Sequence, residues 1–153
     1  MPMKKPSFDV IFMELAQNLA LRSHCTRAQV GCVLTKDTRI ISIGYNGPPA
    51  GTHNCDEEFG EDGCPRDSKG SCSLALHAEQ NAICQAAKNG VSIDGATLYC
   101  RMTPCRVCAM LIINCGIKRV VCERKYHAGL ESEALFKEAG VQLHFIHDEI
   151  QQY

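Results

Sequence analysis

Residues 96–122 read ATLYCRMTPCRVCAMLIINCGIKRVVC, and this stretch decides the fold. Residues 96–103 predict a strand. Pro104 then opens an apolar run of helical length that ends at Gly116, which is the usual placement of proline before and glycine after a helix. Residues 117–122 predict a second strand. Because a helix separates the two strands, partly parallel pairing in a layered α/β domain is expected.

The same alternation continues on both sides of this stretch. Helices are predicted at 7–23, with Ser7 as the cap, at about 76–89, closed by Gly90, and at 129–140, closed by Gly140. Strands are predicted at 29–35 and 39–45, which a polar turn joins as an antiparallel hairpin, and at 141–146. The expected order is helix, strand, strand, helix, strand, helix, strand, helix, strand.

Length and composition describe one globular domain over residues 1–153, with a Gly-, Pro- and acid-rich insertion at about 46–73. The formal net charge of −1 gives no field that would attract nucleic acid or an anionic membrane. No apolar run approaches the ~20 residues of a membrane span, and the first residues lack a signal-peptide core. We therefore expect a cytoplasmic protein with no membrane or nucleic-acid partner.

The chain carries 11 cysteines, an odd number in a chain without an export signal, so metal ligation is favoured over a disulfide framework. Five cysteines lie in apolar segments and are predicted to be core residues: Cys32, Cys84, Cys100, Cys115 and Cys122. The other six require another explanation: Cys25, Cys55, Cys64, Cys72, Cys105 and Cys108.

Cys105 and Cys108 lie three residues apart at the start of a predicted helix, so both thiols project from its first turn. The positive end of the helix dipole lowers thiol pKa values and favours the ligating thiolates. His77 starts the preceding helix, and consecutive helix starts in an alternating unit can converge. One imidazole and two thiolates leave the fourth position of a tetrahedral zinc open, which is the catalytic arrangement.

Glu79 follows His77 by two residues in LHAEQNAI and is predicted to move protons beside the metal. Each fragment alone has a plainer interpretation, in which His77 and Glu79 cap a helix and CRVC contributes two buried cysteines. The combination of HAE and PCRVC, 24 residues apart, favours the catalytic interpretation.

From about Cys25 to Ile146 the chain resembles the zinc-dependent cytidine and deoxycytidylate deaminases. The segments QVGCVL, RIISIGYNGPPAG, LHAEQNAI, TLYCRMTPCRVCAMLIINCGIKRVV and RKYH carry the resemblance. It implies a three-layer α/β fold with a central mixed five-stranded sheet flanked by helices. It also implies zinc-dependent hydrolysis of dCMP to dUMP and ammonia, which supplies dUMP for thymidylate synthesis, with Glu79 shuttling the protons.

The resemblance further implies substrate contacts. Asn46 would bind the deoxyribose, whereas its alternative role is a turn with positive φ at Asn46 and Gly47. Arg27 and Tyr126 would bind the 5′-phosphate, with solvated surface as the alternative, and Arg106 and Arg124 are weaker candidates. Other substrates within the superfamily are transfer-RNA adenosine and free cytosine compounds. Against them stand the acidic CDEEFGED segment and a histidine where free-cytidine enzymes have cysteine.

Cys25, Cys55, Cys64 and Cys72 lie in polar contexts, and four thiolates close a structural zinc site. A second zinc is therefore predicted, with His53 able to replace one cysteine and reactive or buried thiols as the alternative. Part of the family adds regulation by dCTP and dTTP, with Mg²⁺ accompanying the triphosphate, and assembly as a homo-oligomer, a dimer or hexamer. A non-catalytic, competence-type nucleotide-binding protein is the other hypothesis, and the presence of Glu79 argues against it.

Overall fold

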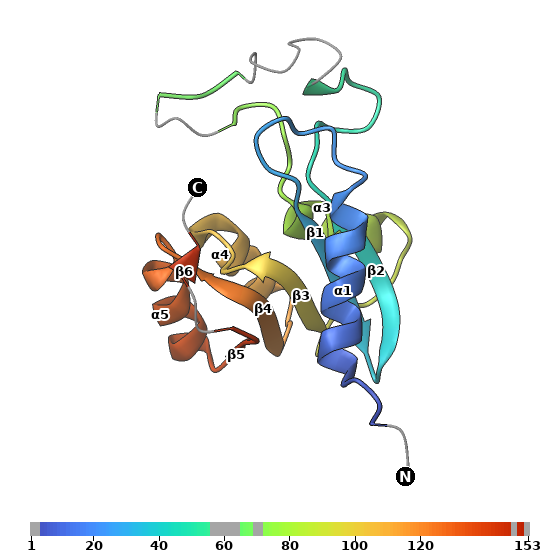
Figure 1. Ribbon diagram of the computed structural model, residues 1–153, viewed down its shortest axis with the longest axis vertical. Helices are drawn as coiled ribbons and strands as arrows, with labels where there is room; N and C mark the ends of the chain where they lie inside the picture. The colour runs from blue at the N-terminus through green and yellow to red at the C-terminus, as the bar shows by residue number, and fades with distance from the viewer. Residues whose placement is uncertain (1–3, 56–64, 69–71, 148–149, 152–153) are drawn as a thin grey trace.

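The computed structural model describes residues 4–55, 65–68, 72–147 and 150–151 (Figure 1). Its elements are α1 (Phe8–Ala20), β1 (Gly31–Lys36), β2 (Arg39–Tyr45), α3 (Ala78–Lys88), β3 (Thr97–Met102), α4 (Arg106–Asn114), β4 (Arg119–Tyr126), α5 (Leu130–Ala139), β5 (Gln142–Phe145) and β6 (Ile150–Gln151). The predicted order of elements is confirmed, and the two-residue β6 is an addition to it.

One mixed sheet has the strand order β2-β1-β3-β4-β5. β1 pairs antiparallel with β2 and with β3, whereas β3 with β4 and β4 with β5 pair in parallel. β6 pairs with the last two residues of β4. The five-stranded mixed sheet that the sequence predicted is therefore confirmed, including the hairpin and the parallel pairing across α4.

Helices cover both faces of the sheet, which gives three layers (Figure 1). Successive residues of a strand point to opposite faces, so Val33 packs with Phe12 and Met13 of α1. Its neighbours Cys32 and Leu34 join the core on the other face, under α3, α4 and α5. In the described part of the chain, no helix is both long and apolar enough to cross a bilayer.

The connections follow the expected turn chemistry. Asp37 and Thr38 join β1 to β2 with φ of 51° and 60°, as in the two-residue type I′ turn whose twist matches that of the strands. The boundaries predicted for the whole domain and for the insertion at 46–73 stay predictions.

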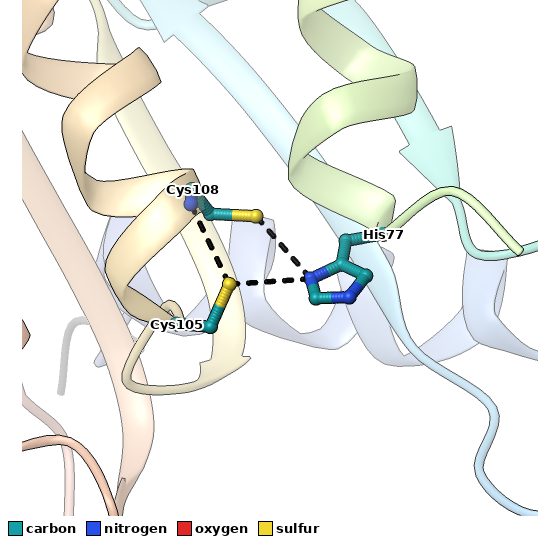
Figure 2. A group of neighbouring side chains, drawn as sticks. All are labelled: His77, Cys105 and Cys108. Carbon is teal, nitrogen blue, oxygen red and sulfur yellow. Dashed lines mark hydrogen bonds between the residues drawn. The ribbon is translucent and has the colours of Figure 1, made fainter. Parts of the chain in front are cut away.

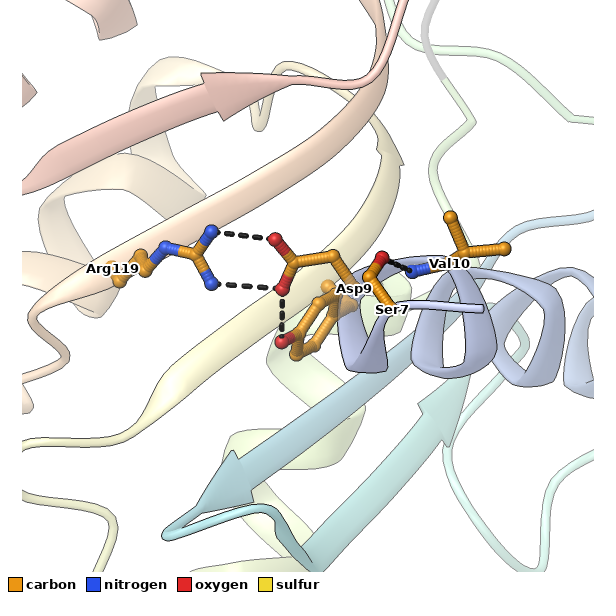
Figure 3. Close-up of polar contacts among 5 residues, drawn as sticks. Ser7, Asp9, Val10 and Arg119 are labelled. Carbon is orange, nitrogen blue, oxygen red and sulfur yellow. Dashed lines mark hydrogen bonds and ion pairs between the residues drawn. The ribbon is translucent and has the colours of Figure 1, made fainter. Parts of the chain in front are cut away.

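An ion pair fixes α1 to the sheet (Figure 3). Ser7 caps the helix by accepting a hydrogen bond from the Val10 backbone N–H at 3.2 Å. Both carboxylate oxygens of Asp9 accept hydrogen bonds from Arg119 of β4, at 2.9 and 2.6 Å, and the Tyr99 hydroxyl of β3 donates a third at 2.8 Å. These bonds to Arg119 lower the pKa of Asp9. Burial, followed by the bond to Asp9, raises the pKa of Tyr99 to about 12.

The predicted core cysteines divide into two groups. Cys32, Cys100 and Cys122 are fully buried in β1, β3 and β4. Cys115 is only partly buried and Cys84 is exposed, so the core prediction was wrong for Cys84. The buried positions of α3 include 78, 82 and 86, four residues apart, and position 84 lies off this stripe.

Candidate active site

His77, Cys105 and Cys108 converge as the sequence predicted (Figure 2). His77 is the N-cap of α3, Cys105 is the N-cap of α4, and Cys108 lies in the first turn of α4. The His77 Nδ1 atom lies 3.5 Å from the Cys105 sulfur and 3.3 Å from the Cys108 sulfur. All three ligand atoms lie within 4.8 Å of one another. The ring of His77 therefore faces the two thiols, so the role of His77 is not limited to capping α3.

These distances fit a single tetrahedral metal ion. Zinc bonds of ~2.3 Å to sulfur and ~2.0 Å to nitrogen place a sulfur and a nitrogen roughly 3.5 Å apart in a tetrahedron. Cys108 is buried, Cys105 is partly buried and His77 is exposed. The group thus opens to solvent on one side, where a fourth ligand can enter.

The electrostatics of the three side chains suit a metal ligand set. The hydrogen bond with Cys108, supported by the contact with His77, lowers the pKa of Cys105 to about 4. The same bond, followed by burial, raises the pKa of Cys108. The hydrogen bond with Cys105 raises the pKa of His77. One thiolate is therefore ready to bind a cation, and metal binding would displace the proton of the Cys108 thiol.

Glu79 lies in the first turn of α3, only 6% exposed, next to the Cys108 thiol. Burial raises the pKa of its carboxyl group, although the nearby His77 opposes that shift. A buried carboxyl group with a raised pKa beside potential metal ligands can both accept and donate a proton.

Contacts that the sequence analysis missed hold the first turns of α3 in place. The Gln80 side-chain oxygen accepts a hydrogen bond from the His77 backbone N–H at 2.8 Å, which fixes the backbone at this ligand. The Asn81 side chain donates to the Tyr45 carbonyl at 2.8 Å, and the Ser42 hydroxyl donates to the Ala82 carbonyl at 2.7 Å.

Gly44 brings β2 close to α3. A Cβ atom at this glycine would lie 2.5 Å from the Ala78 carbonyl oxygen and from the Ala82 nitrogen, so only glycine permits the contact. A glycine inside a predicted strand was the signal for such a close approach.

The loop that contains Asn46 lies beside the site, and the Asn46 side chain forms hydrogen bonds with backbone groups. Its side-chain oxygen accepts from the Val30 N–H and its amide donates to the Ala28 carbonyl, both at 2.8 Å. Gly47 and Leu76 exchange two backbone hydrogen bonds, which places this loop beside the residue that precedes His77. Among the described non-glycine residues only Asp37 and Thr38 have positive φ, and Gly47 does not. The alternative role of a positive-φ turn at Asn46 and Gly47 was therefore wrong.

The predicted phosphate contacts lie in different places. Tyr126 ends β4, and its backbone N–H bonds to Thr103, two residues before Cys105. Arg27 lines a hollow of about 540 Å³ with Gln17 and Arg101; its lining includes Cys25 but not His77, Cys105 or Cys108. Arg106 pairs with Glu131 at 2.8 Å, and Arg124 lies 3.7 Å from Glu123.

The predicted second metal site is only partly described. Cys64 lies outside the described residues. Cys55 is buried, Cys25 and Cys72 are partly buried, and His53 is exposed. Within the ranges that the structure describes, these four residues do not form a three-ligand group like that of His77.

Comparison with known proteins adds to this geometry. Residues 6–124 match the family model described as the cytidine and deoxycytidylate deaminase zinc-binding region. The chain is 43% identical to the deoxycytidylate deaminase of Schizosaccharomyces pombe, over 91% of this chain and 44% of that protein. It therefore spans less than half the length of that relative.

Two further similarities are informative. The chain is 40% identical to ComE operon protein 2 of Bacillus subtilis, over 91% of this chain and 71% of that protein. The crystal structure of the dCMP deaminase from cyanophage S-TIM5 in complex with dCMP and dUMP is similar with a TM-score of 0.78 and 32% identity. The match covers 94% of this chain and 99% of that one.

Proposed function

This chain belongs to the zinc-binding cytidine and deoxycytidylate deaminase family, and from that premise we propose that it hydrolyses dCMP to dUMP and ammonia. The observation that carries the proposal is the convergence of His77, Cys105 and Cys108 beside the buried carboxyl group of Glu79. The similarity to the phage enzyme bound to dCMP and dUMP supports this substrate over other members of the superfamily. The product would supply thymidylate synthesis.

His77, Cys105 and Cys108 would hold the zinc ion through Nδ1 and two sulfurs, since their spacing fits its tetrahedral bonds. When bound, zinc lowers the pKa of a water molecule and acts as a Lewis acid. Replacing the 4-amino group with oxygen consumes one water molecule and releases one ammonia. The exposed side of the ligand group gives both substrate and water access to the site.

Glu79 would carry the protons. Hydrolysis at C4 requires that a proton move from water to the ring nitrogen N3 and that another reach the departing amine. The carboxyl group lies two residues after His77 and next to Cys108. One carboxyl group can therefore accept the first proton and return it without a second acid.

Substrate contacts are proposed at three residues. Asn46, whose side chain also holds residues 28–30 in place, would bind the deoxyribose. Tyr126, next to Thr103 at the end of β4, would bind the 5′-phosphate together with Arg27. Arginine can grip a phosphate group with two parallel hydrogen bonds.

Further parts of the proposal concern structure and regulation. A second zinc would be bound by Cys25, Cys55, Cys64 and Cys72, with His53 as a substitute ligand, and it would hold the insertion. Effectors dCTP and dTTP, with Mg²⁺, would bind near residues 46–51. The exposed apolar residues Val107, Met110 and Leu111 of α4 would pack in a homo-oligomer. A cytoplasmic location is also proposed, because a chain that uses cysteine thiolates as metal ligands suits a reducing compartment.

Turnover of dCMP, deoxycytidine, cytidine and a transfer RNA by the zinc-loaded protein tests the proposal. We expect ammonia release from dCMP, with kcat/KM roughly a hundredfold above that for deoxycytidine, because two charge-assisted contacts to phosphate account for such a ratio. Equal rates on dCMP and deoxycytidine would reject the nucleotide assignment. Deamination of transfer RNA alone would favour the RNA-editing alternative, and zinc binding without turnover would favour a binding protein.

A further inference from the structure

Thr103 links the segment that leads to the candidate metal ligand Cys105 with the turn that begins at Tyr126. It lies between the end of β3 and Cys105, and it is only 4% exposed. Its hydroxyl oxygen accepts a hydrogen bond from the Tyr126 backbone N–H at 3.1 Å. A candidate metal ligand and a candidate substrate contact are therefore joined by one buried side chain.

The Thr103 hydroxyl links the two chains beyond the last paired residues of β3 and β4. The parallel pairing of β3 with β4 ends at Met102 and Arg124. Beyond that point the chain leaves β3 and enters the 103–105 segment that leads into α4. The Thr103 hydroxyl oxygen accepts from the N–H of Tyr126, two residues further along β4, where Tyr126 also pairs with Gln151 of β6.

Gly129 fits against the same side chain. A Cβ atom at Gly129 would lie 2.8 Å from both Cβ and Cγ2 of Thr103, closer than real Cβ contacts. The Gly129 N–H also donates to the Tyr126 carbonyl at 3.0 Å, which closes the turn from 126 to 129. Thr103 thus contacts this turn at both ends, by a hydrogen bond at Tyr126 and by close packing at Gly129.

We propose that Thr103 is a positioning residue that sets the distance between the Tyr126 turn and the Cys105 and Cys108 ligands. The inference rests on the proposed function, in which the cytosine ring lies at the metal and Tyr126 binds the phosphate. A nucleotide can reach both points only if their separation matches its length. Thr103 therefore determines the preference for a 5′-phosphate without contacting the substrate.

Replacement of Thr103 separates positioning from simple stability. Thr103→Val keeps the branched shape and removes the acceptor, whereas Thr103→Ser keeps the hydroxyl. Gly129→Ala moves the turn and leaves the hydroxyl intact. Thr35→Val is the matched control, because Thr35 is another buried threonine but pairs with Thr97 at the opposite end of β3.

The measurements are kcat and KM for dCMP and deoxycytidine, zinc content, and hydrogen exchange at the Tyr126 amide. For Thr103→Val and Gly129→Ala we expect the dCMP preference to fall about tenfold through KM, as the loss of one well-placed contact would produce. We expect zinc content to be kept, and faster exchange at Tyr126 in Thr103→Val. Thr103→Ser should restore most of the preference, and Thr35→Val should not change it.

The outcomes distinguish this inference from the proposed function. If wild type deaminates dCMP and both Thr103→Val and Gly129→Ala keep the wild-type preference, the positioning role is overturned and the deaminase assignment stands. If Thr103→Val does not fold, the preference of Gly129→Ala decides. If wild type shows no turnover of dCMP, the proposed function fails and the role of Thr103 fails with it.

Discussion

Removing the charge of Asp9 should lower the free energy of unfolding by an amount that depends on how far its ion pair with Arg119 is buried. Asp9→Asn keeps the shape of the side chain but breaks a two-pronged ion pair with Arg119 and weakens the bond from Tyr99. The Asp9 and Arg119 side chains are 26% and 32% exposed. Exposed pairs contribute about 0–1 kcal/mol, and breaking a buried pair costs about 3–5 kcal/mol. For this partly exposed pair we expect a loss of about 1–2 kcal/mol in the free energy of unfolding.

The stability difference between wild type and Asp9→Asn should become smaller as the pH falls. Because Arg119 lowers the pKa of Asp9, the folded state keeps this carboxylate charged at pH values where the unfolded chain, with a pKa near ~3.9, binds a proton. The stabilisation is therefore fully present above the unfolded pKa and is lost as the pH falls through the lower folded pKa. The difference between wild type and Asp9→Asn should shrink below about pH 4.

Urea unfolding of both proteins between pH 3 and pH 7 measures this difference. Glu131→Gln is the control, because it breaks the Arg106 pair, whose side chains are 55% and 67% exposed. That pair should contribute much less. Equal losses for Asp9→Asn and Glu131→Gln, or a loss from Asp9→Asn that is unchanged at pH 3, would refute the reasoning.

Three further predictions concern the site. Gly44→Ala should lower the free energy of unfolding by about 1–3 kcal/mol and reduce turnover, because the added Cβ meets the α3 backbone. Urea unfolding measures this loss, and Gly47→Ala is the control, because its added Cβ would meet no atom within 4 Å. Gln80→Ala should weaken zinc binding about 10–100-fold in chelator competition, with the exposed Gln85→Ala as control. Arg27→Ala should reduce kcat/KM for dCMP about tenfold or more and leave deoxycytidine nearly unchanged, since only dCMP has the phosphate; equal losses would make Arg27 structural.

The order of elements and the ligand trio could be predicted because both depend on local signals. Strands and helices were marked by periodicity, proline and glycine. The spacing from His77 to Cys105 spans one helix and one strand, so the two helix starts meet at the same end of the sheet. Cys84 was misjudged because an apolar neighbourhood in sequence does not state which face of a helix is buried.

The supporting contacts could not be predicted from the sequence because they join segments that are distant along the chain. The Thr103 hydroxyl meets the Tyr126 N–H across 23 residues, and Asn46 holds residues 28–30. The glycine at position 44 of a predicted strand indicated a close backbone approach, but the sequence did not show which segment would approach it. Such contacts depend on how strands and helices are placed in space, which no local pattern encodes.

Ammonia release from dCMP by zinc-loaded wild type and Glu79→Gln tests the central claim most directly. The amide keeps the shape of the carboxyl group but cannot carry a proton, so we predict retained zinc, an unchanged fold and a fall in kcat of ~10²–10⁴-fold, the usual contribution of a general acid–base group. A Glu79→Gln protein that binds zinc and keeps more than about a tenth of the wild-type kcat would contradict the account, because a loss that small is below what a proton carrier contributes.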